Sequence, residues 1–262
     1  MIRSTSAYLF LLLGTFFQLN AQTAVSEAKS FCHPEENSLI WQQTSAEYKA
    51  LCIQAYHLAQ SNVDQRVAEL SSIESAKPLA IVMDLDETVL DNSPYSVEMM
   101  RRGESYSSDS WEEWVNLEQA ELVPGAKDFI QYAQEKGIEV FFISNRSKNS
   151  LAATYSNLIK LGIECKVNQL LLKDDNSKLE RRQTLDDHTV IMLIGDNLAD
   201  FHEDFETELS LEERDQLVMD THQAEFGEKY IILPNNLYGD WMTAIKRAAK
   251  GRAAQLELLK GF

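Results

Sequence analysis

Short apolar runs alternate with longer stretches of helical period along most of this chain. The first run ends abruptly at Asp84, as a strand does when it is buried on both faces of a parallel sheet. The runs span residues 79–83, 138–143, 167–172, 190–194 and 230–233. This pattern predicts strands of one parallel sheet.

The segments that separate or precede these runs have the spacing of helices. Apolar residues recur at helical intervals in 45–70, 124–136 and 149–161. Pro124 stands at the start of the second segment and Gly137 follows its end, as helix boundaries favour. Thr44 and Glu47 have the spacing of a capping box, which predicts a helix start there.

The alternation of strands and helices predicts a Rossmann-like α/β fold, in which right-handed crossovers join the parallel strands. Residues 38–75 form an N-terminal helical element ahead of the first strand. Residues 92–123 break the alternation and are rich in Tyr, Trp, Ser and Glu. We interpret them as a small insertion over one end of the sheet.

The N-terminus has the features of an export signal. Residues 7–17 are apolar, Arg3 is the one charge before them, and the small residue Ala21 follows. This run is too short to span a membrane and matches the core of a signal peptide, although a buried N-terminal helix is the alternative. We expect a signal at 1–21, a single catalytic or binding domain at 22–262, and a periplasmic or secreted protein. Because no cysteine follows the core, we predict no stable membrane anchor.

The composition is that of an ordinary globular protein with a strong acidic excess. The 262 residues include 24 Lys or Arg and 41 Asp or Glu, so the formal net charge is −17. Hydrophobic residues make up 44% and charged residues 25%, which argues against a disordered or fibrous chain. Binding to a nucleic acid polymer needs a basic surface, so the acidic balance argues against it and we expect no such partner. An anionic substrate would need a local cation.

The cysteines and histidines are not spaced as a disulfide framework, a metal site or a catalytic triad would require. Three cysteines are too few for a disulfide framework; Cys32 and Cys52 are the closest pair, and Cys52 fits a buried thiol in a helix. The histidines show neither ligand nor triad spacing and are interpreted as surface or packing residues. They are His33, His57, His188, His202 and His222.

Polar residues that could bind a ligand or take part in catalysis follow four of the predicted strands. Ligand sites of open α/β sheets gather at the carboxyl ends of the strands, so these residues should meet. In chain order they are Asp84 with Asp86, Ser144 with Asn145, Lys178, and Asp196 with Asp200.

This set of residues suits phosphoryl transfer. A carboxylate can attack phosphorus, and a second carboxyl can protonate the leaving oxygen and then activate water. Mg²⁺ prefers oxygen ligands, which Asp84, the Asp86 carbonyl and Asp196 could supply. A lysine and a hydroxyl would neutralise and orient the phosphoryl oxygens.

The motif DLDETVLDN at 84–92 resembles the first motif of the haloacid dehalogenase (HAD) superfamily, and in particular the class C bacterial acid phosphatases, which are secreted or lipoprotein 5′-nucleotidases. Further short segments resemble that family and are spread over nearly the whole chain after the signal. They are WQQTSAEY at 41–48, WEEW at 111–114, LVPGA at 122–126, ISNR at 143–146, GDNL at 195–198 and LPNNLYGDW at 233–241.

The resemblance implies a role for each matching residue. Asp84 would be the nucleophile and Asp86 the general acid and base, while Ser144, Asn145 and Lys178 would bind the phosphoryl group. The implied Mg²⁺ ligands are Asp84, Asp86, Asp196 and Asp200. Trp111 and Tyr238 stand where the family holds the nucleobase between aromatic side chains.

Several of these residues also have a purely structural interpretation. Asp200 could complement a helix dipole, Ser144 could cap a helix, and Lys178 could be a solvated charge. Trp111 could belong to the core. Lys173, Arg181 and Arg182 compete with Lys178 for the lysine role, and Lys178 fits best by its place after DDNS.

Taken together, the residues and the resemblance predict an exported, Mg²⁺-dependent acid phosphatase that hydrolyses nucleoside 5′-monophosphates through an aspartyl-phosphate. The alternatives are a broad or sugar-phosphate phosphatase of the same fold and a non-catalytic storage or binding protein. The expected partner is a small phosphomonoester, and a homodimer is the assembly we consider.

Overall fold

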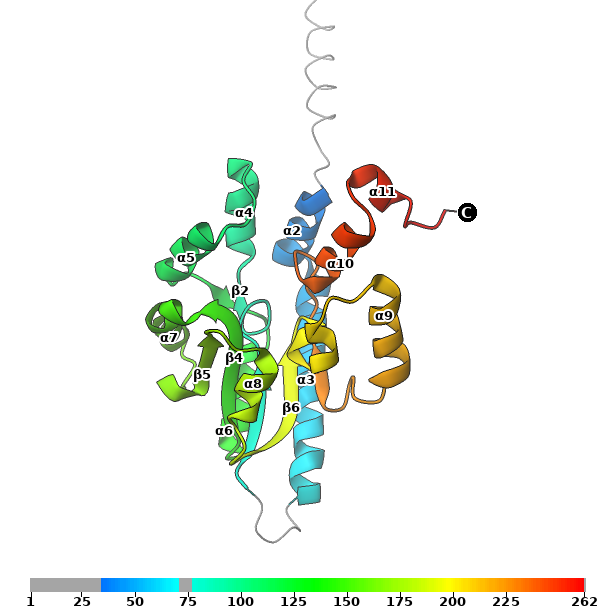
Figure 1. The fold of residues 1–262 in the computed structure, drawn as a ribbon. Coiled ribbons are helices and arrows are strands. Elements are labelled where there is room, and N and C mark those ends of the chain that lie inside the picture. Colours follow the sequence, from blue (N-terminus) through cyan, green and yellow to red (C-terminus); the bar gives the residue numbers. More distant parts are fainter. Residues whose placement is uncertain (1–33, 71–76, 262) are drawn as a thin grey trace, which may run out of the picture.

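A five-stranded, all-parallel sheet forms the centre of the computed structural model, which describes residues 34–70 and 77–261 (Figure 1). The strands are β1 (Leu79–Met83), β4 (Glu139–Ser147), β5 (Leu170–Lys173), β6 (Thr189–Gly195) and β7 (Tyr230–Ile232). Their order across the sheet is β5-β4-β1-β6-β7. Each predicted run overlaps one of these strands, so the expected α/β fold is confirmed.

Strand β1 lies in the middle of the sheet and is buried on both faces. Ile81 and Met83 point into one hydrophobic core, and Ala80 and Val82 point into a second core on the opposite face. This division follows from the two-residue period of a strand. Because β4 and β6 flank β1, the carboxyl ends of these three strands lie next to one another.

Helices cover both faces of the sheet. One face packs against α3 (Ala46–Leu70), α6 (Ala126–Glu135) and α7 (Leu151–Lys160), which supply core residues such as Tyr56, Phe129 and Leu158. The other face carries α8 (Lys178–Gln183) and the loop residues Leu185 and Phe201. Further helices are α2 (Pro34–Thr44), α9 (Leu211–Gln216), α10 (Asp240–Ala248) and α11 (Arg252–Leu256).

The predicted capping box at Thr44 is wrong by one residue. Helix α2 runs through Thr44, whose hydroxyl donates to the Ile40 carbonyl at 2.6 Å. The break between α2 and α3 therefore falls at Ser45, and its Oγ accepts from the Tyr48 amide at 3.1 Å. Ser45 is the residue between the two helices, and its side chain therefore takes the capping position of α3.

Two helices and two very short strands lie between β1 and α6, which leads into β4. Strands β2 (Leu90–Asp91) and β3 (Glu121–Leu122) pair antiparallel, and α4 (Ser93–Arg102) and α5 (Ser108–Leu117) lie between them in sequence. Figure 1 shows α4 and α5 beyond the carboxyl ends of the central strands, across from α2 and α10. These elements therefore flank the edge where the polar residues were expected to meet.

No helix in the described ranges is long and apolar enough to cross a membrane. The expected signal at 1–21 and Cys32 lie outside these ranges.

Candidate active site

Asp84 follows β1 directly and meets Lys178 in the interior. The Lys178 Nζ donates to Asp84 Oδ1 at 2.5 Å and to Asp200 Oδ1 at 2.5 Å. All three side chains are nearly completely buried. The sheet thus brings together residues that lie far apart in the sequence, because each follows or adjoins a strand at the same edge.

A local capping interaction places Lys178 in the first turn of α8. Ser177 Oγ accepts from the Glu180 amide at 3.1 Å, while the Ser177 amide donates to Glu180 Oε2 at 2.8 Å. This reciprocal pair starts the helix at Lys178. The sequence DDNSKLE therefore contained a start signal that fixes which lysine enters the site.

The competing basic residues have other partners. Lys173 is exposed at the end of β5. Arg181 donates to the backbone carbonyls of Ser144 and Leu171, and Arg182 donates to the carbonyl of Asp200 at 2.6 Å. The two arginines therefore hold the backbone around the site, and Lys178 alone among the four reaches Asp84.

Burial and neighbouring charge shift the pKa values of this cluster. Burial raises the pKa of Asp84 to about 7, against the opposing attraction of Lys178, with Asp200 and Asp86 adding to the rise. Burial, followed by Asp200 and Asp84, raises the pKa of Asp196 well above its ordinary value. Burial alone would lower the pKa of Lys178, but the two carboxylates outweigh it and raise that pKa. One ammonium group does not balance three carboxylates, of which Asp84 and Asp200 are buried and Asp196 is half-buried.

Asp196 and Asp200 come from the end of β6 and the turn after it. Asp196 Oδ2 accepts from Asn235 Nδ2 at 2.7 Å, and its Oδ1 accepts from the Thr88 hydroxyl at 3.3 Å. Asp200 Oδ2 accepts from the Asn197 amide at 2.9 Å, in a single 3-10 turn. The structure thus aims the Asp200 carboxylate at Lys178 and away from the solvent.

Gly195 makes room for Asp200. A Cβ atom at this position would lie 2.2 Å from Asp200 Oδ2 and 2.5 Å from Asp200 Cβ. The glycine of the GDNL motif is therefore required by close packing at the end of β6.

The oxygen atoms of Asp84, Asp196 and Asp200 fit a hard divalent cation. One carboxylate oxygen from each residue lies within 4.8 Å of the others. The donor set contains oxygen only, which is the type that Mg²⁺ prefers, and the excess negative charge among buried carboxylates favours a cation there.

Asp86 lies beside this cluster but has partners of its own. The Ser144 hydroxyl donates to Asp86 Oδ2 at 3.1 Å, and Asn92 Nδ2 donates to Asp86 Oδ1 at 2.9 Å. Ser144 belongs to β4, and its Oγ accepts from the Arg146 amide at 3.1 Å. Its alternative interpretation as a helix cap is therefore wrong, because the chain is still extended at this residue.

Arg146 was noted in the sequence as part of the strand-end motif ISNR but was given no role, yet it is the main partner of Asp86. Its Nε and Nη2 lie 2.9 Å and 2.8 Å from Asp86 Oδ1. The guanidinium also donates to Thr154 Oγ1 and Asn92 Oδ1, and Asn92 Oδ1 accepts from Trp114 Nε1 at 2.9 Å. The signal was available: a charged side chain two residues after the serine of ISNR must find a partner if the strand end is buried.

The two predicted nucleobase residues lie in different contact groups. Trp111 is half-buried in α5, with its ring centroid 5.0 Å from that of Tyr95 and 5.9 Å from Arg146 Cζ. Tyr238 lies in the loop after β7, where its amide donates to Asn235 Oδ1 at 3.4 Å. Thus Trp111 neighbours the group around Asp86, and Tyr238 neighbours the group around Asp196.

Asn145 is exposed at the end of β4, and its Oδ1 accepts from Arg181 Nη2 at 3.0 Å. Trp114, by contrast, packs against the hydrophobic core in addition to its bond to Asn92. Of the two tryptophans in WEEW, Trp114 is therefore the core residue.

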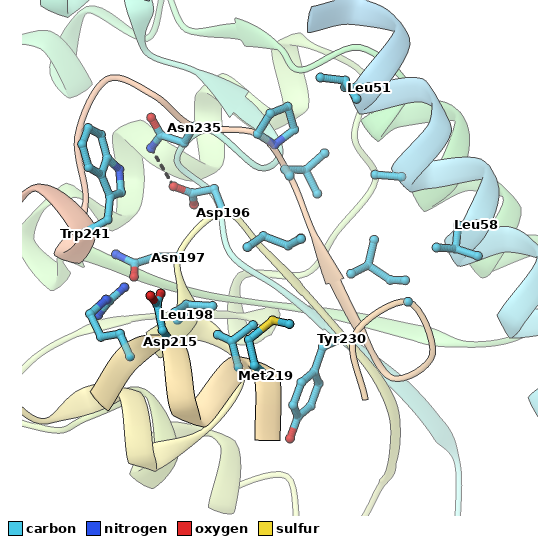
Figure 2. Close-up of a pocket in the computed structure, with 18 of the residues that line it drawn as sticks. Leu51, Leu58, Asp196, Asn197, Leu198, Asp215, Met219, Tyr230, Asn235 and Trp241 are labelled. Atoms are coloured by element: carbon cyan, nitrogen blue, oxygen red, sulfur yellow. Dashed lines mark hydrogen bonds between the residues drawn. The ribbon is translucent and has the colours of Figure 1, made fainter. Parts of the chain in front are cut away.

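An apolar pocket of about 700 Å³ opens beside the acidic cluster (Figure 2). Asp196, Asn235 and Trp241 lie at one end of it, and Leu58 and Met219 line the apolar remainder. Asp84, Lys178, Trp111 and Tyr238 are not among its lining residues. The pocket therefore adjoins the cluster from the β7 side and is separate from the predicted aromatic site.

Comparison with known proteins gives consistent results. The family model described as HAD superfamily, subfamily IIIB (acid phosphatase) matches residues 15–241. The class C acid phosphatase from Bacillus anthracis has a similar structure, with a TM-score of 0.78 and 37% identity over 87% of this chain and 97% of that one. Its tungstate-bound form matches equally well, with the same TM-score of 0.78.

Curated relatives are more distant. The stem 28 kDa glycoprotein of Glycine max is 25% identical over 195 residues, or 70% of this chain and 69% of its own length. The stem 31 kDa glycoprotein of the same species is 25% identical over 195 residues, which make up 60% of its length. The family match and the close structural match agree: this chain belongs to the acid phosphatases of HAD subfamily IIIB and is a phosphoric monoester hydrolase.

Proposed function

We propose that this protein is an exported, Mg²⁺-dependent acid phosphatase that hydrolyses nucleoside 5′-monophosphates through an aspartyl-phosphate on Asp84. The observation that carries the proposal is the separation of two neighbouring carboxyl groups. Asp84 pairs with Lys178, whereas Asp86 pairs with Arg146 and Ser144. Two carboxyls in different surroundings can take different roles in one reaction.

In the first step, an Asp84 carboxylate oxygen attacks phosphorus and the bond to the ester oxygen breaks. Asp86 gives its proton to that leaving oxygen, so that a neutral alcohol departs. In the second step, Asp86 takes a proton from water, and the water oxygen attacks the phosphorus of the aspartyl-phosphate. Inorganic phosphate leaves, and Asp84 and Asp86 return to their initial states.

Lys178 supports this reaction by its charge, with Ser144 and Asn145 as the further phosphoryl-binding residues. Mg²⁺ would be held by Asp84, Asp196, Asp200 and the backbone carbonyl of Asp86, and when bound it would supply charge that draws the phosphate dianion to an acidic site. Lys178 already neutralises part of the Asp84 and Asp200 charge in the interior.

The nucleotide preference rests on Trp111 and Tyr238. Base stacking on an aromatic ring contributes ~1–3 kcal/mol and tolerates any base. Trp111 is half-buried next to Arg146, and Tyr238 follows Asn235, which bonds Asp196. Each aromatic residue thus neighbours a residue that contacts the acidic site, namely Arg146 for Trp111 and Asn235 for Tyr238.

Export and domain organisation complete the proposal. Residues 1–21 would be removed as a signal, and 22–262 would act as one catalytic domain with additions at 38–75 and 92–123. N-terminal sequencing of the protein recovered outside the cytoplasm should begin at Gln22. A homodimer remains a prediction that light scattering on the mature protein would test.

Phosphate release from nucleotides and from sugar phosphates tests the chemistry. Wild type with Mg²⁺ should be active, and Asp84→Asn or a chelator should abolish most activity, whereas Asp128→Asn, an exposed aspartate in α6, should not. An inactive wild type, or an Asp84→Asn variant that keeps most of its activity, would overturn the mechanism.

Substrate class needs a separate experiment. Tyr238→Ala should lower kcat/KM for nucleotides about 10-fold or more and leave sugar phosphates nearly unchanged, as the loss of one stacking contact implies. Tyr132→Ala on α6 provides the aromatic control. Equal losses on both substrate classes would favour the broad or sugar-phosphate alternative.

A further inference from the structure

A second group of possible metal ligands lies outside the acidic site and consists of His202, Asp204 and His222. The His222 Nε2 is 2.9 Å from Asp204 Oδ2, and the His202 Nδ1 is 3.2 Å from the same oxygen. The two imidazole centroids are 4.5 Å apart. One carboxylate oxygen thus lies between two imidazole nitrogens.

The local backbone explains why residues this far apart in sequence converge. His202 and Asp204 lie at the start of a 3-10 turn, η4 (Glu203–Glu206). His222 follows η5 (Leu217–Thr221), which is a π-helix, and its amide donates to the Leu217 carbonyl at 2.8 Å. π-helical turns are rare and occur frequently at functional sites.

The imidazole of His202 is close to two atoms of Asp204. Its Nδ1 accepts from the Asp204 amide at 3.2 Å and lies 3.2 Å from Asp204 Oδ2. Because this nitrogen has one lone pair, a metal ion bound to Nδ1 would replace the bond to the amide. The same ion would also be bound by Asp204 Oδ2, which lies within 3.2 Å of a nitrogen of each imidazole.

The surroundings are acidic and open on one side. Burial raises the pKa of the Tyr230 phenol, and Glu225 and Asp204 raise it further against the opposing effect of Arg182. Glu225 Oε2 is buried and has no hydrogen-bond partner among the described residues. The His222 side chain is buried, whereas those of His202 and Asp204 are 36% and 40% exposed. An ion could therefore enter from solvent.

We propose that His202, Asp204 and His222 form a second metal site that takes a nitrogen-seeking divalent ion of the Zn²⁺ class. Zinc holds such ligands at about 2.0–2.2 Å, which places neighbouring ligand atoms roughly 3.4 Å apart in a tetrahedron. The observed separations are 2.9 Å and 3.2 Å, so small side-chain movements suffice. Water would complete the shell. This site differs from the oxygen-only acidic cluster in its two imidazole ligands. Nitrogen ligands suit Zn²⁺ and not Mg²⁺, so the two sites should prefer different metals.

The site would brace the segment between its ligands. That segment carries α9 and η5, whose residues Leu211 and Met219 line the apolar pocket in Figure 2. It also begins two residues after Asp200. Zn²⁺ would thus hold one wall of the pocket and the turn that presents Asp200.

Zn²⁺ binding to the intact protein, in excess Mg²⁺, tests the proposal. Wild type should bind Zn²⁺ with imidazole nitrogen in the X-ray absorption spectrum of the metal, and Zn²⁺ should raise Tm. His222→Gln and His202→Asn should weaken Zn²⁺ binding roughly 100-fold or more, since even an outer-shell partner is worth 10–100-fold. His188→Gln removes a histidine that pairs with Asp187 elsewhere and should bind as wild type does.

Because His222 is buried, its substitution could also disturb folding. His202 is half-exposed, so His202→Asn tests the site with less effect on the fold. Circular dichroism should show that both variants are folded. Oxygen-only coordination of the bound Zn²⁺ would mean that it occupies the acidic cluster, and the proposal would fail. It would fail equally if folded His202→Asn bound Zn²⁺ as tightly as wild type, or if no Zn²⁺ bound at all.

Discussion

Arg146 holds Asp86 through two nitrogens that meet the same carboxylate oxygen, Nε at 2.9 Å and Nη2 at 2.8 Å. The arginine side chain is only 1% exposed and is itself fixed by Asn92 and Thr154. Asp84, two residues earlier, pairs with Lys178 instead. Each of the two carboxylates thus pairs with a different cationic side chain. The two neighbouring acidic groups therefore point toward different partners and can take different roles in the reaction.

The first prediction concerns Arg146 as a positioning residue. Arg146→Lys keeps the charge but loses the planar, two-nitrogen contact that holds Asp86. We expect kcat to fall about 100-fold on nucleotides, whose leaving alcohol needs a proton, because general acid catalysis contributes 10²–10⁴-fold. We expect a much smaller fall on p-nitrophenyl phosphate, whose leaving group needs little protonation.

Comparison of the two substrates separates this role from a general loss of structure. Arg66→Lys changes an exposed arginine on α3 and should alter neither rate. Equal losses on both substrates by Arg146→Lys would show that the arginine does not act through Asp86.

The second prediction concerns the buried ammonium group of Lys178. Lys178→Gln should reduce phosphatase activity by about 10²–10³-fold, the size seen when one electrostatic stabiliser is removed. The metal-free variant should also be less stable by roughly 3–5 kcal/mol, because Asp84 and Asp200 lose their shared cation. Activity assays and urea denaturation measure the two effects. Lys173→Gln, at an exposed position in β5, should leave both unchanged.

Gly195 provides a third test, which is steric. A Cβ in Gly195→Ala would meet Asp200 Oδ2 at 2.2 Å and so must displace the Asp200 carboxylate. We expect Mg²⁺ affinity and kcat to fall together, about 10-fold or more, because a displaced ligand changes metal binding that strongly. Gly261→Ala meets no atom within 4 Å and is the control. A normal Mg²⁺ titration of folded Gly195→Ala would contradict the assigned role of Asp200.

Metal removal gives a fourth test at the level of stability. Mg²⁺ should raise Tm, since an ion that binds only the folded state adds about 2.7 kcal/mol at 100 times its Kd. Asp196→Asn should abolish most of that rise while making the metal-free protein more stable, because Asp196 has a raised pKa among like charges. Differential scanning calorimetry with and without Mg²⁺ measures both. A rise in Tm that survives in Asp196→Asn would place Mg²⁺ elsewhere.

The fifth prediction is a pH dependence at Cys52. This thiol is completely buried, and burial raises its pKa to about 11. At pH 8 the reactive thiolate is thus a smaller fraction of Cys52 than of an ordinary exposed cysteine. The labelling rate of Cys52 should be roughly 100-fold or more below that of such a cysteine, and it should increase steeply toward pH 11. Mass spectrometry of the labelled peptide measures the rate, with urea-unfolded protein as the control. Rapid labelling of Cys52 in the folded protein at pH 8 would contradict this burial.

Much of the fold could be predicted from local patterns. Every expected apolar run overlaps a strand, because a strand buried on both faces needs an apolar side chain at nearly every position. Boundaries were less predictable: the run at 167–172 begins with a 3-10 turn, and β5 starts only at Leu170. The helix expected from 124 begins at Ala126, because Gly125 has a positive φ of 90°.

The sequence by itself determined which edge of the sheet would carry the chemistry, since Asp84, Ser144 and Asp196 each follow or end an apolar run. Carboxyl ends of adjacent parallel strands must lie together, and this rule needs no coordinates.

Only the tertiary structure decided which side chains pair across that edge. It placed the Lys178 Nζ between Asp84 and Asp200, paired Arg146 with Asp86, and brought the His202 and His222 rings to within 4.5 Å of each other. The physical reason is that burial obliges each charge to find a partner, and the nearest partner is set by packing between elements far apart in the chain, which no local spacing records.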